Sequence, residues 1–152
     1  MRKALLLMVA FGLISSIKAQ EPDWHFHYGQ SGAYFSIFDL QIDKDDNIYA
    51  LALMSPGTDI DPGPEEMLLE GESSSNRALL KFRPDGSIVW GKSLGSLSVQ
   101  LRLSPSGEIV LGGSVHKESQ LDGQTFTSNG RSDFFLAKLS SEGNLLWGFS
   151  VG

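Results

Sequence analysis

The sequence predicts an all-β fold made of two four-stranded antiparallel sheets. Three observations predict it: a tryptophan-and-glycine pattern recurs, glycine-type turns recur between short apolar runs, and no stretch after Gln20 has the apolar spacing and caps of a helix. The 17 glycines suit a fold with many turns. Because the chain has no cysteine, packing must hold it without disulfides, and a lipid-anchored cysteine is excluded.

Residues 1–19 have the pattern of a secretory signal peptide. The basic pair Arg2-Lys3 precedes an apolar run over residues 5–17, which at about 13 residues is too short to cross a bilayer comfortably. Ala19 is small enough to precede a cleavage site, so the mature chain is expected to begin near Gln20. We therefore predict an exported protein: secreted, periplasmic or at the cell surface. The alternatives are an uncleaved anchor and a buried helix.

The mature chain is acidic. Removal of Arg2, Lys3 and Lys18 leaves nine basic residues against 18 acidic ones, a net charge of −9. A nucleic-acid binder needs a basic face, and anionic lipid attracts basic segments, so the charge argues against both partners. We expect no nucleic-acid partner and no membrane insertion of the mature chain; solubility is the simplest reason for the charge.

One pattern occurs three times: Trp, three residues, an apolar residue and Gly. It spans residues 24–29, 90–95 and 147–152, with spacings of 66 and 57 residues. The predicted units are an N-terminal orphan strand and two repeats, at residues 20–36, 37–95 and 96–152.

Hairpin turns punctuate both repeats. Each has Pro, Ser or Asp near its start and, in three of the four, Gly in fourth place, where a tight hairpin turn needs a left-handed residue. Asp46 stands in that place in the first turn, and Asp tolerates the conformation at some cost. The predicted turns are residues 43–46, 83–86, 104–107 and 140–143.

Each repeat is expected to supply four strands. Phe38, Leu40 and Ile42 alternate with polar residues, as in a half-buried strand, whereas 48–53 is continuously apolar, as in an inner strand. The middle of each repeat reads as a longer connection, and residues 70–76 as a solvated loop. The predicted strands are 37–43, 48–54, 78–82 and 87–94, then 99–103, 108–115, 134–139 and 144–151.

Residues 133–139, followed by Glu142-Gly143-Asn144 and Trp147, resemble the bacterial β-propeller repeat sometimes called the SBBP repeat. The Asp-Pro-Gly-Pro stretch at 61–64 is similar to the same place in exported members, and the resemblance covers residues 24–152. It implies that each repeat is one four-stranded blade of an incomplete propeller, since about four to eight blades close a ring. The orphan strand would complete a last blade that is missing.

The first repeat departs from that pattern in two places. Asn76-Arg77-Ala78 stands where the second repeat has Asp133-Phe134-Phe135, and Asp46 replaces a Gly. With only two blades present, three interpretations stay open. The chain is a piece of a longer protein, a complete chain that self-associates into a ring or stack, or a stand-alone open sheet domain whose exposed edges need covering loops.

Metal sites are weakly indicated. Residues 43–47 place oxygens as a calcium loop does, but the turn alignment and the missing Gly and late acid favour an ordinary hairpin turn. Asp59 and Asp61 are followed by prolines that favour rigid turns. His25 and His27 share one strand face and His116 is the only other histidine, which is too few ligands for zinc.

No catalytic, cofactor-binding or metal-binding residue is assigned. Residues 91–95, Gly-Lys-Ser-Leu-Gly, have the spacing of a Gly-x-Ser-x-Gly elbow, but no helix is expected after them, as such an elbow needs. The pairs Gly112-Gly113 and Asp122-Gly123 likewise precede no helix that would bind phosphate. A glycosidase-type carboxylate pair stays open, because loops can bring distant acids together. The three tryptophans are expected to pack in the core or between blades, so Trp90→Ala should cost about 3–5 kcal/mol if buried.

The sequence favours an exported, non-catalytic interaction or structural module. Repeats with variable connections present extended surfaces to an unknown protein or glycan partner. The alternative is part of a propeller enzyme, such as a carbohydrate hydrolase or lyase, and it rests on analogy alone. Acids or histidines recurring on channel-facing strands of further blades would favour the enzyme.

Overall fold

The computed structural model describes residues 34–69 and 76–152, and within these ranges the chain is all-β, without a helix, as predicted. The predicted signal peptide at residues 1–19 and nearly all of the predicted orphan strand at 20–36 lie outside the described residues. No helix in the described part of the chain is long and apolar enough to cross a membrane.

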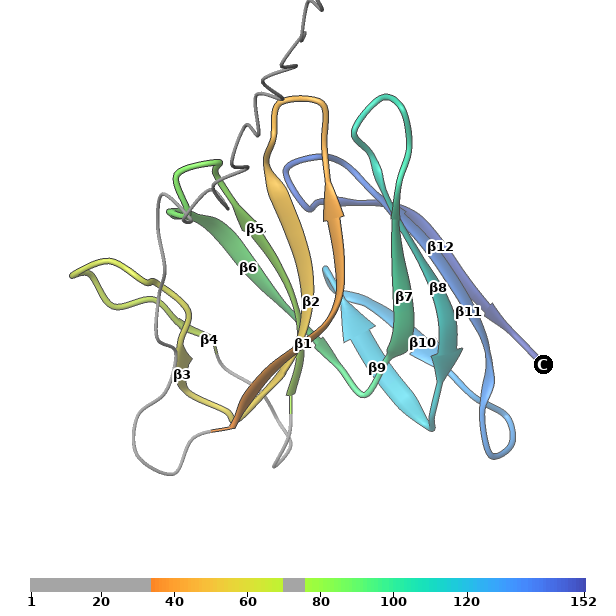
Figure 1. Ribbon diagram of the computed structural model, residues 1–152. Coiled ribbons are helices and arrows are strands. Elements are labelled where there is room, and N and C mark those ends of the chain that lie inside the picture. The colour runs from red at the N-terminus through yellow and green to blue at the C-terminus, as the bar shows by residue number, and fades with distance from the viewer. Residues whose placement is uncertain (1–33, 70–75) are drawn as a thin grey trace, which may run out of the picture.

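Two four-stranded antiparallel sheets form the framework (Figure 1). The first sheet has the order β1-β2-β5-β6 and the second the order β7-β8-β11-β12, so each sheet is a meander. The strands of the first sheet are β1 Phe35–Ile42, β2 Ile48–Met54, β5 Asn76–Phe82 and β6 Ile88–Gly95. Those of the second are β7 Ser98–Leu103, β8 Ile109–Val115, β11 Asp133–Leu139 and β12 Leu145–Val151.

Two short hairpins correct the prediction of plain connections. Between the second and third strands of each sheet the chain folds back on itself as a two-stranded ribbon. The first ribbon pairs β3 Thr58–Asp59 with β4 Leu68–Leu69 and the second pairs β9 Glu118–Leu121 with β10 Gln124–Thr127. The eight main strands lie within two residues of their predicted bounds.

The four predicted hairpin turns share one hydrogen-bond scheme. In the turn that begins at Ser140, the Gly143 N–H donates to the Ser140 carbonyl at 3.0 Å, and the Ser140 N–H donates to the Asn144 carbonyl at 2.8 Å. The same two bonds form in the other three turns, at 43–47, 83–87 and 104–108. The fourth residue has φ of +82° or +83° where it is Gly, and Asp46 adopts φ +61° in the same place. The prediction that Asp46 takes the left-handed position is confirmed.

Ladder register relates the two sheets position by position. Lys81 pairs with both Tyr49 and Trp90 in the first sheet, as Lys138 pairs with Val110 and Trp147 in the second. We call two residues equivalent when they hold the same register position in the two sheets. Equivalent residues allow the surroundings of one sheet to be compared directly with those of the other.

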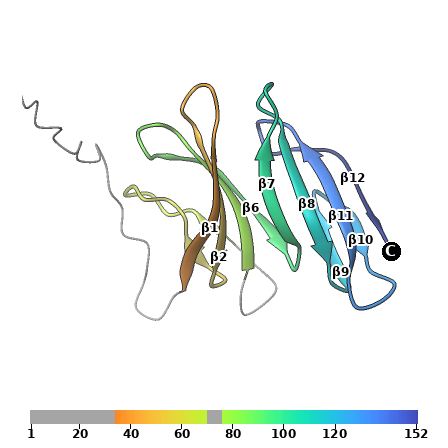
Figure 2. The same cartoon turned by 45° about the vertical axis from the view of Figure 1, so that its right-hand side comes forward.

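The larger core lies between the sheets. Tyr49, Leu51 and Leu79 of the first sheet face the second sheet, which contributes the opposite side of the core. The edge strands β1 and β7 lie beside one another along this interface, as Figure 2 shows. The second sheet and its ribbon contribute Val99, Leu101, Ile109, Leu111, Val115, Leu121, Phe126, Phe135, Ala137 and Leu139.

A second core covers the other face of the first sheet. There Ile60, beside the β3–β4 ribbon, packs against Ala50, Ala52 and Leu80. Gly91 lies beneath Ile60, and a Cβ at this position would sit 2.1 Å from the Ile60 Cδ1 atom. The close approach explains the glycine after the tryptophan.

Candidate functional site

The interface between the sheets shows which contacts the tryptophan makes when a neighbouring sheet covers it. Trp90 lies edge-on to Tyr49, with ring centroids 6.2 Å apart, and packs on Gly143 of the second sheet's last turn. Lys81 lies over the Tyr49 ring and donates from its Nζ to the Ser141 carbonyl at 3.0 Å. Trp90 and Lys81 of the first sheet therefore both contact the turn of the second sheet that contains Gly143.

The equivalent surface of the second sheet is open. Trp147 is 45% exposed although Trp90 holds the same register position, and its indole faces away from the first sheet. We call the residues around it the aromatic strip. It consists of Phe134, Trp147, Phe149 and Val151, which are 45–60% exposed and lie on β11 and β12. These two strands form the side of the second sheet that is remote from β1 and β7 (Figure 2).

The rings of the aromatic strip are ordered against one another. Trp147 and Phe149 are stacked, with centroids 6.2 Å apart and planes 15° from parallel, and Phe134 lies 6.2 Å from Phe149 on the other side. Register places the three on one face of the sheet, because Phe149 pairs with Leu136 and Val151 with Phe134. A contiguous exposed apolar patch of this kind is characteristic of an interaction site.

Lys138 lies next to the aromatic strip and forms an ion pair with Glu108. Its Nζ atom lies 2.7 Å from Glu108, whose carboxylate also accepts from the Ser106 hydroxyl at 2.7 Å. The hydrogen bond from Lys138, and then that from Ser106, keep the pKa of Glu108 below its ordinary value. Glu108 is therefore charged near neutral pH, and Lys138 has a local partner where the equivalent Lys81 reaches across to the next sheet.

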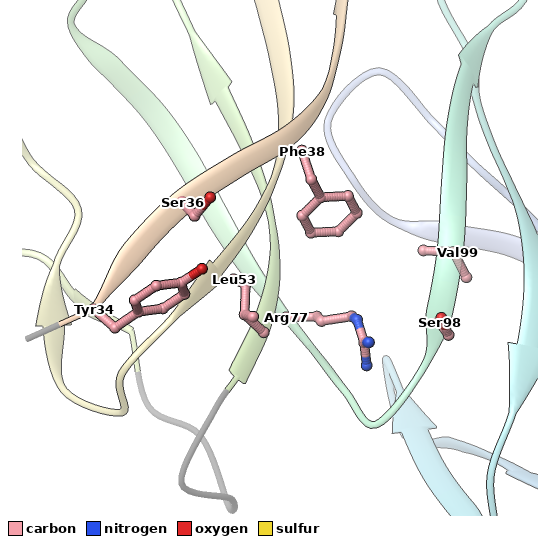
Figure 3. Close-up of a pocket in the computed structure, with 7 residues that line it drawn as sticks. All are labelled: Tyr34, Ser36, Phe38, Leu53, Arg77, Ser98 and Val99. Carbon is pink, nitrogen blue, oxygen red and sulfur yellow. The ribbon is translucent and has the colours of Figure 1, made fainter.

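A cleft of about 410 Å³ opens between the two sheets at β1 and β7. In Figure 3 the Arg77 side chain extends from β5 toward Ser98, and the rings of Tyr34 and Phe38 line the β1 side. The remaining lining residues are Ser36, Leu53 and Val99. The cleft offers one cation, several hydroxyls and two rings, and these lining residues include no carboxylate or imidazole.

An ion pair joins the first sheet to the second ribbon. Lys92 on β6 contacts the Asp122 carboxylate, and the other Asp122 oxygen accepts from the Leu145 N–H at 2.6 Å. Partial burial raises the pKa of Asp122, but the hydrogen bonds from Lys92 and Leu145 outweigh burial, so its pKa lies below its ordinary value. The pair is structural and lies apart from the cleft lining.

The acidic candidates from the sequence are engaged in turns. Asp43 accepts from the Asp45 and Asn47 N–H groups at 2.9 Å each and from the Asn47 side chain, as in a side-chain-capped turn. Asp59 accepts from the Asp61 N–H at 3.0 Å. The carboxylates thus satisfy local backbone donors. Within the described ranges, no group of three or more His, Cys, Asp or Glu side chains is arranged to hold a metal ion.

The histidine candidates are not brought together in the described residues. His116 is exposed, with its Nδ1 atom 3.2 Å from the Arg131 carbonyl. His25 and His27, together with Trp24, lie outside the described residues.

Two sequence expectations are wrong at single residues. Trp147 is not packed in a core or between sheets, although Trp90 is. Asn76, expected in a solvated loop, is fully buried as the first residue of β5, where its Oδ1 atom accepts from the Ser93 hydroxyl at 2.7 Å. The aromatic strip itself was missed, although Trp147, Phe149 and Val151 alternate with period two and mark one strand face.

Comparison with known proteins finds no match for this chain among protein-family models, curated proteins or solved structures.

Proposed function

We propose that the chain is an exported, non-catalytic module of propeller-type repeats that acts by binding a partner at the aromatic strip. The observation that carries the proposal is the contrast between Trp90 and Trp147. The two residues hold equivalent positions, but Trp90 packs on the neighbouring sheet whereas Trp147 is 45% exposed. Exposed, mutually stacked rings on a rigid sheet keep little side-chain freedom to lose, so binding there costs little ordering entropy.

The sequence pattern and the matching strand orders of the two sheets support the repeat. The amino-terminal pattern supports export. The partner is a protein or a glycan, because stacked tryptophan and phenylalanine suit apolar protein faces and sugar rings alike. The propeller-enzyme alternative has less support, because the lining of the cleft between the sheets includes no carboxylate or imidazole.

The test compares the mature chain, from residue 20 on, with the double variant Trp147→Ser/Phe149→Ser. Both are applied to a glycan array, used as bait for pull-down, and measured for self-association. We expect at least one binding event that the double variant loses and that purified components reproduce. Leu146→Ser is the matched control, because Leu146 is 51% exposed on the same strand but is not part of the strip. If wild type and double variant behave alike in all three assays, the proposal is wrong.

A further inference from the structure

We propose that the aromatic strip is a docking surface for a second copy of this chain, stacked head to tail so that the first sheet of one copy covers the second sheet of the other. This inference rests on the proposed function and names the partner at the same site. The interface between the two sheets of one chain supplies the template. Within the chain, the second sheet covers the Trp90 face of the first sheet. In the stack, the first sheet of a second copy covers the aromatic strip in the same way.

The interface between the sheets has two sides, one from each sheet. The side that is covered in one sheet is exposed in the other. One side is the sheet face that bears the tryptophan. This face is covered at Trp90 in the first sheet and exposed at Trp147 in the second. The other is the opposite face of the edge strand: Leu101 on β7 is fully buried against the first sheet, whereas the equivalent Leu40 on β1 is 46% exposed.

The exposed residues of β1 continue along one face. Ile42 is 58% exposed, whereas its equivalent Leu103 packs against the core between the sheets. Ile37 is 45% exposed and pairs with Ala52, on the same face as Leu40. The chain thus carries an uncovered aliphatic edge at one end and an uncovered aromatic face at the other, which are the two sides of its own internal interface.

Polar contacts at the edge strands are compatible with the same stacking. Within the chain, the Asp39 carboxylate accepts from the Leu101 N–H at 2.8 Å and lies 3.7 Å from the Arg102 guanidinium. The residues equivalent to Asp39 and Arg102 are Gln100 and Gln41, so where β7 of one copy meets β1 of the next, two neutral amides would lie side by side. Amides donate and accept, so this pair bonds without burying an unpaired charge.

The stacking is heterologous, because different surfaces of the two copies meet. Such a contact extends copy by copy, and it forms a closed ring if the rotation between sheets closes and an open stack if it does not. It therefore predicts assemblies larger than a dimer at high concentration.

The first experiment measures the mass of the mature chain by sedimentation velocity as its concentration rises. We expect concentration-dependent growth beyond dimer for the wild type, about tenfold or more weaker association for Trp147→Ser/Phe149→Ser, and wild-type association for Leu146→Ser. Circular dichroism checks that the variants keep their β structure. A wild type that stays monomeric throughout overturns the stacking, while strip-dependent binding to a glycan or another protein would leave the proposed function standing.

The second experiment fixes the orientation. The chain contains no cysteine, so Gln100→Cys and Gln41→Cys place single thiols at the proposed contact. A short bismaleimide should cross-link a mixture of the two variants into a mixed dimer more efficiently than it cross-links either variant alone. Self-association without preferential mixed cross-linking would show that the head-to-tail arrangement is wrong.

Discussion

At the scale of single residues, the glycines that follow Trp90 and Trp147 have a steric reason. Gly91 lies under Ile60, and Gly148 lies under Phe126, whose Cζ atom would be 2.9 Å from an added Cβ. Both bulky side chains belong to the segments inserted between the second and third strands of their sheets, and both are buried. In both sheets the glycine therefore makes room for the inserted segment, on the sheet face opposite to the neighbouring indole.

The first prediction concerns this close approach. Gly91→Ala should lower the free energy of unfolding by about 1–3 kcal/mol, because the added Cβ would clash with the fully buried Ile60 side chain and force it to shift. Ile60→Val removes the Cδ1 atom, so the double variant should be more stable than the sum of the two single losses predicts. Urea denaturation measures all three.

Gly130→Ala is the control, because a Cβ there meets nothing within 4 Å; its effect should stay within about 0.5 kcal/mol. Additive losses in the double variant would show that the two positions do not clash.

At the scale of elements, the turns were predictable and the ribbons were not. Four turns share a local signal that needs no tertiary contact, a left-handed fourth residue after a capping polar group. The β3 and β4 strands have only two residues each, too few to show a period-two pattern. Ile60 is ordered by burial against Leu80 and Gly91, which are distant in the sequence.

The second prediction compares two turns that differ in the residue with positive φ, which is Asp46 in one turn and Gly107 in the other. Asp46→Gly should stabilise the protein by about 0.5–1 kcal/mol, because glycine adopts φ +61° without a Cβ penalty. Gly107→Ala should destabilise it by about 1–2 kcal/mol, although its Cβ would meet nothing within 4 Å. Thermal and urea unfolding measure both; equal signs for the two changes would contradict the conformational explanation.

At the scale of the whole molecule, one ion pair ties the sheets together across the ribbon. Asp122 bonds Lys92 of the first sheet and the first residue of β12, Leu145, in the second. Because the pKa of Asp122 is lowered on folding, its contribution to stability is present at neutral pH, above the unfolded-state value near 4. That contribution is lost as the pH falls through the lowered pKa.

The third prediction follows from this sign. The wild type should be more stable than Asp122→Asn at pH 7, and the difference should shrink as the pH falls below about 4. Asparagine tolerates the left-handed backbone of residue 122, φ +50°, so the change removes the charge and one of the two acceptor oxygens without backbone strain. Urea unfolding across the pH range measures it, with Lys92→Met expected to reduce the same pH dependence. A difference that is constant with pH would refute the assignment.

The sequence by itself determined the eight strands of the two sheets, their antiparallel pairing by short turns, and the left-handed residue in each of the four turns. These features depend on side-chain alternation and backbone conformation over a few neighbouring residues. Only the tertiary structure decided which face of each sheet is covered. Trp90 and Trp147 have the same local pattern, yet one is packed and the other exposed, because burial depends on whether a second sheet lies opposite.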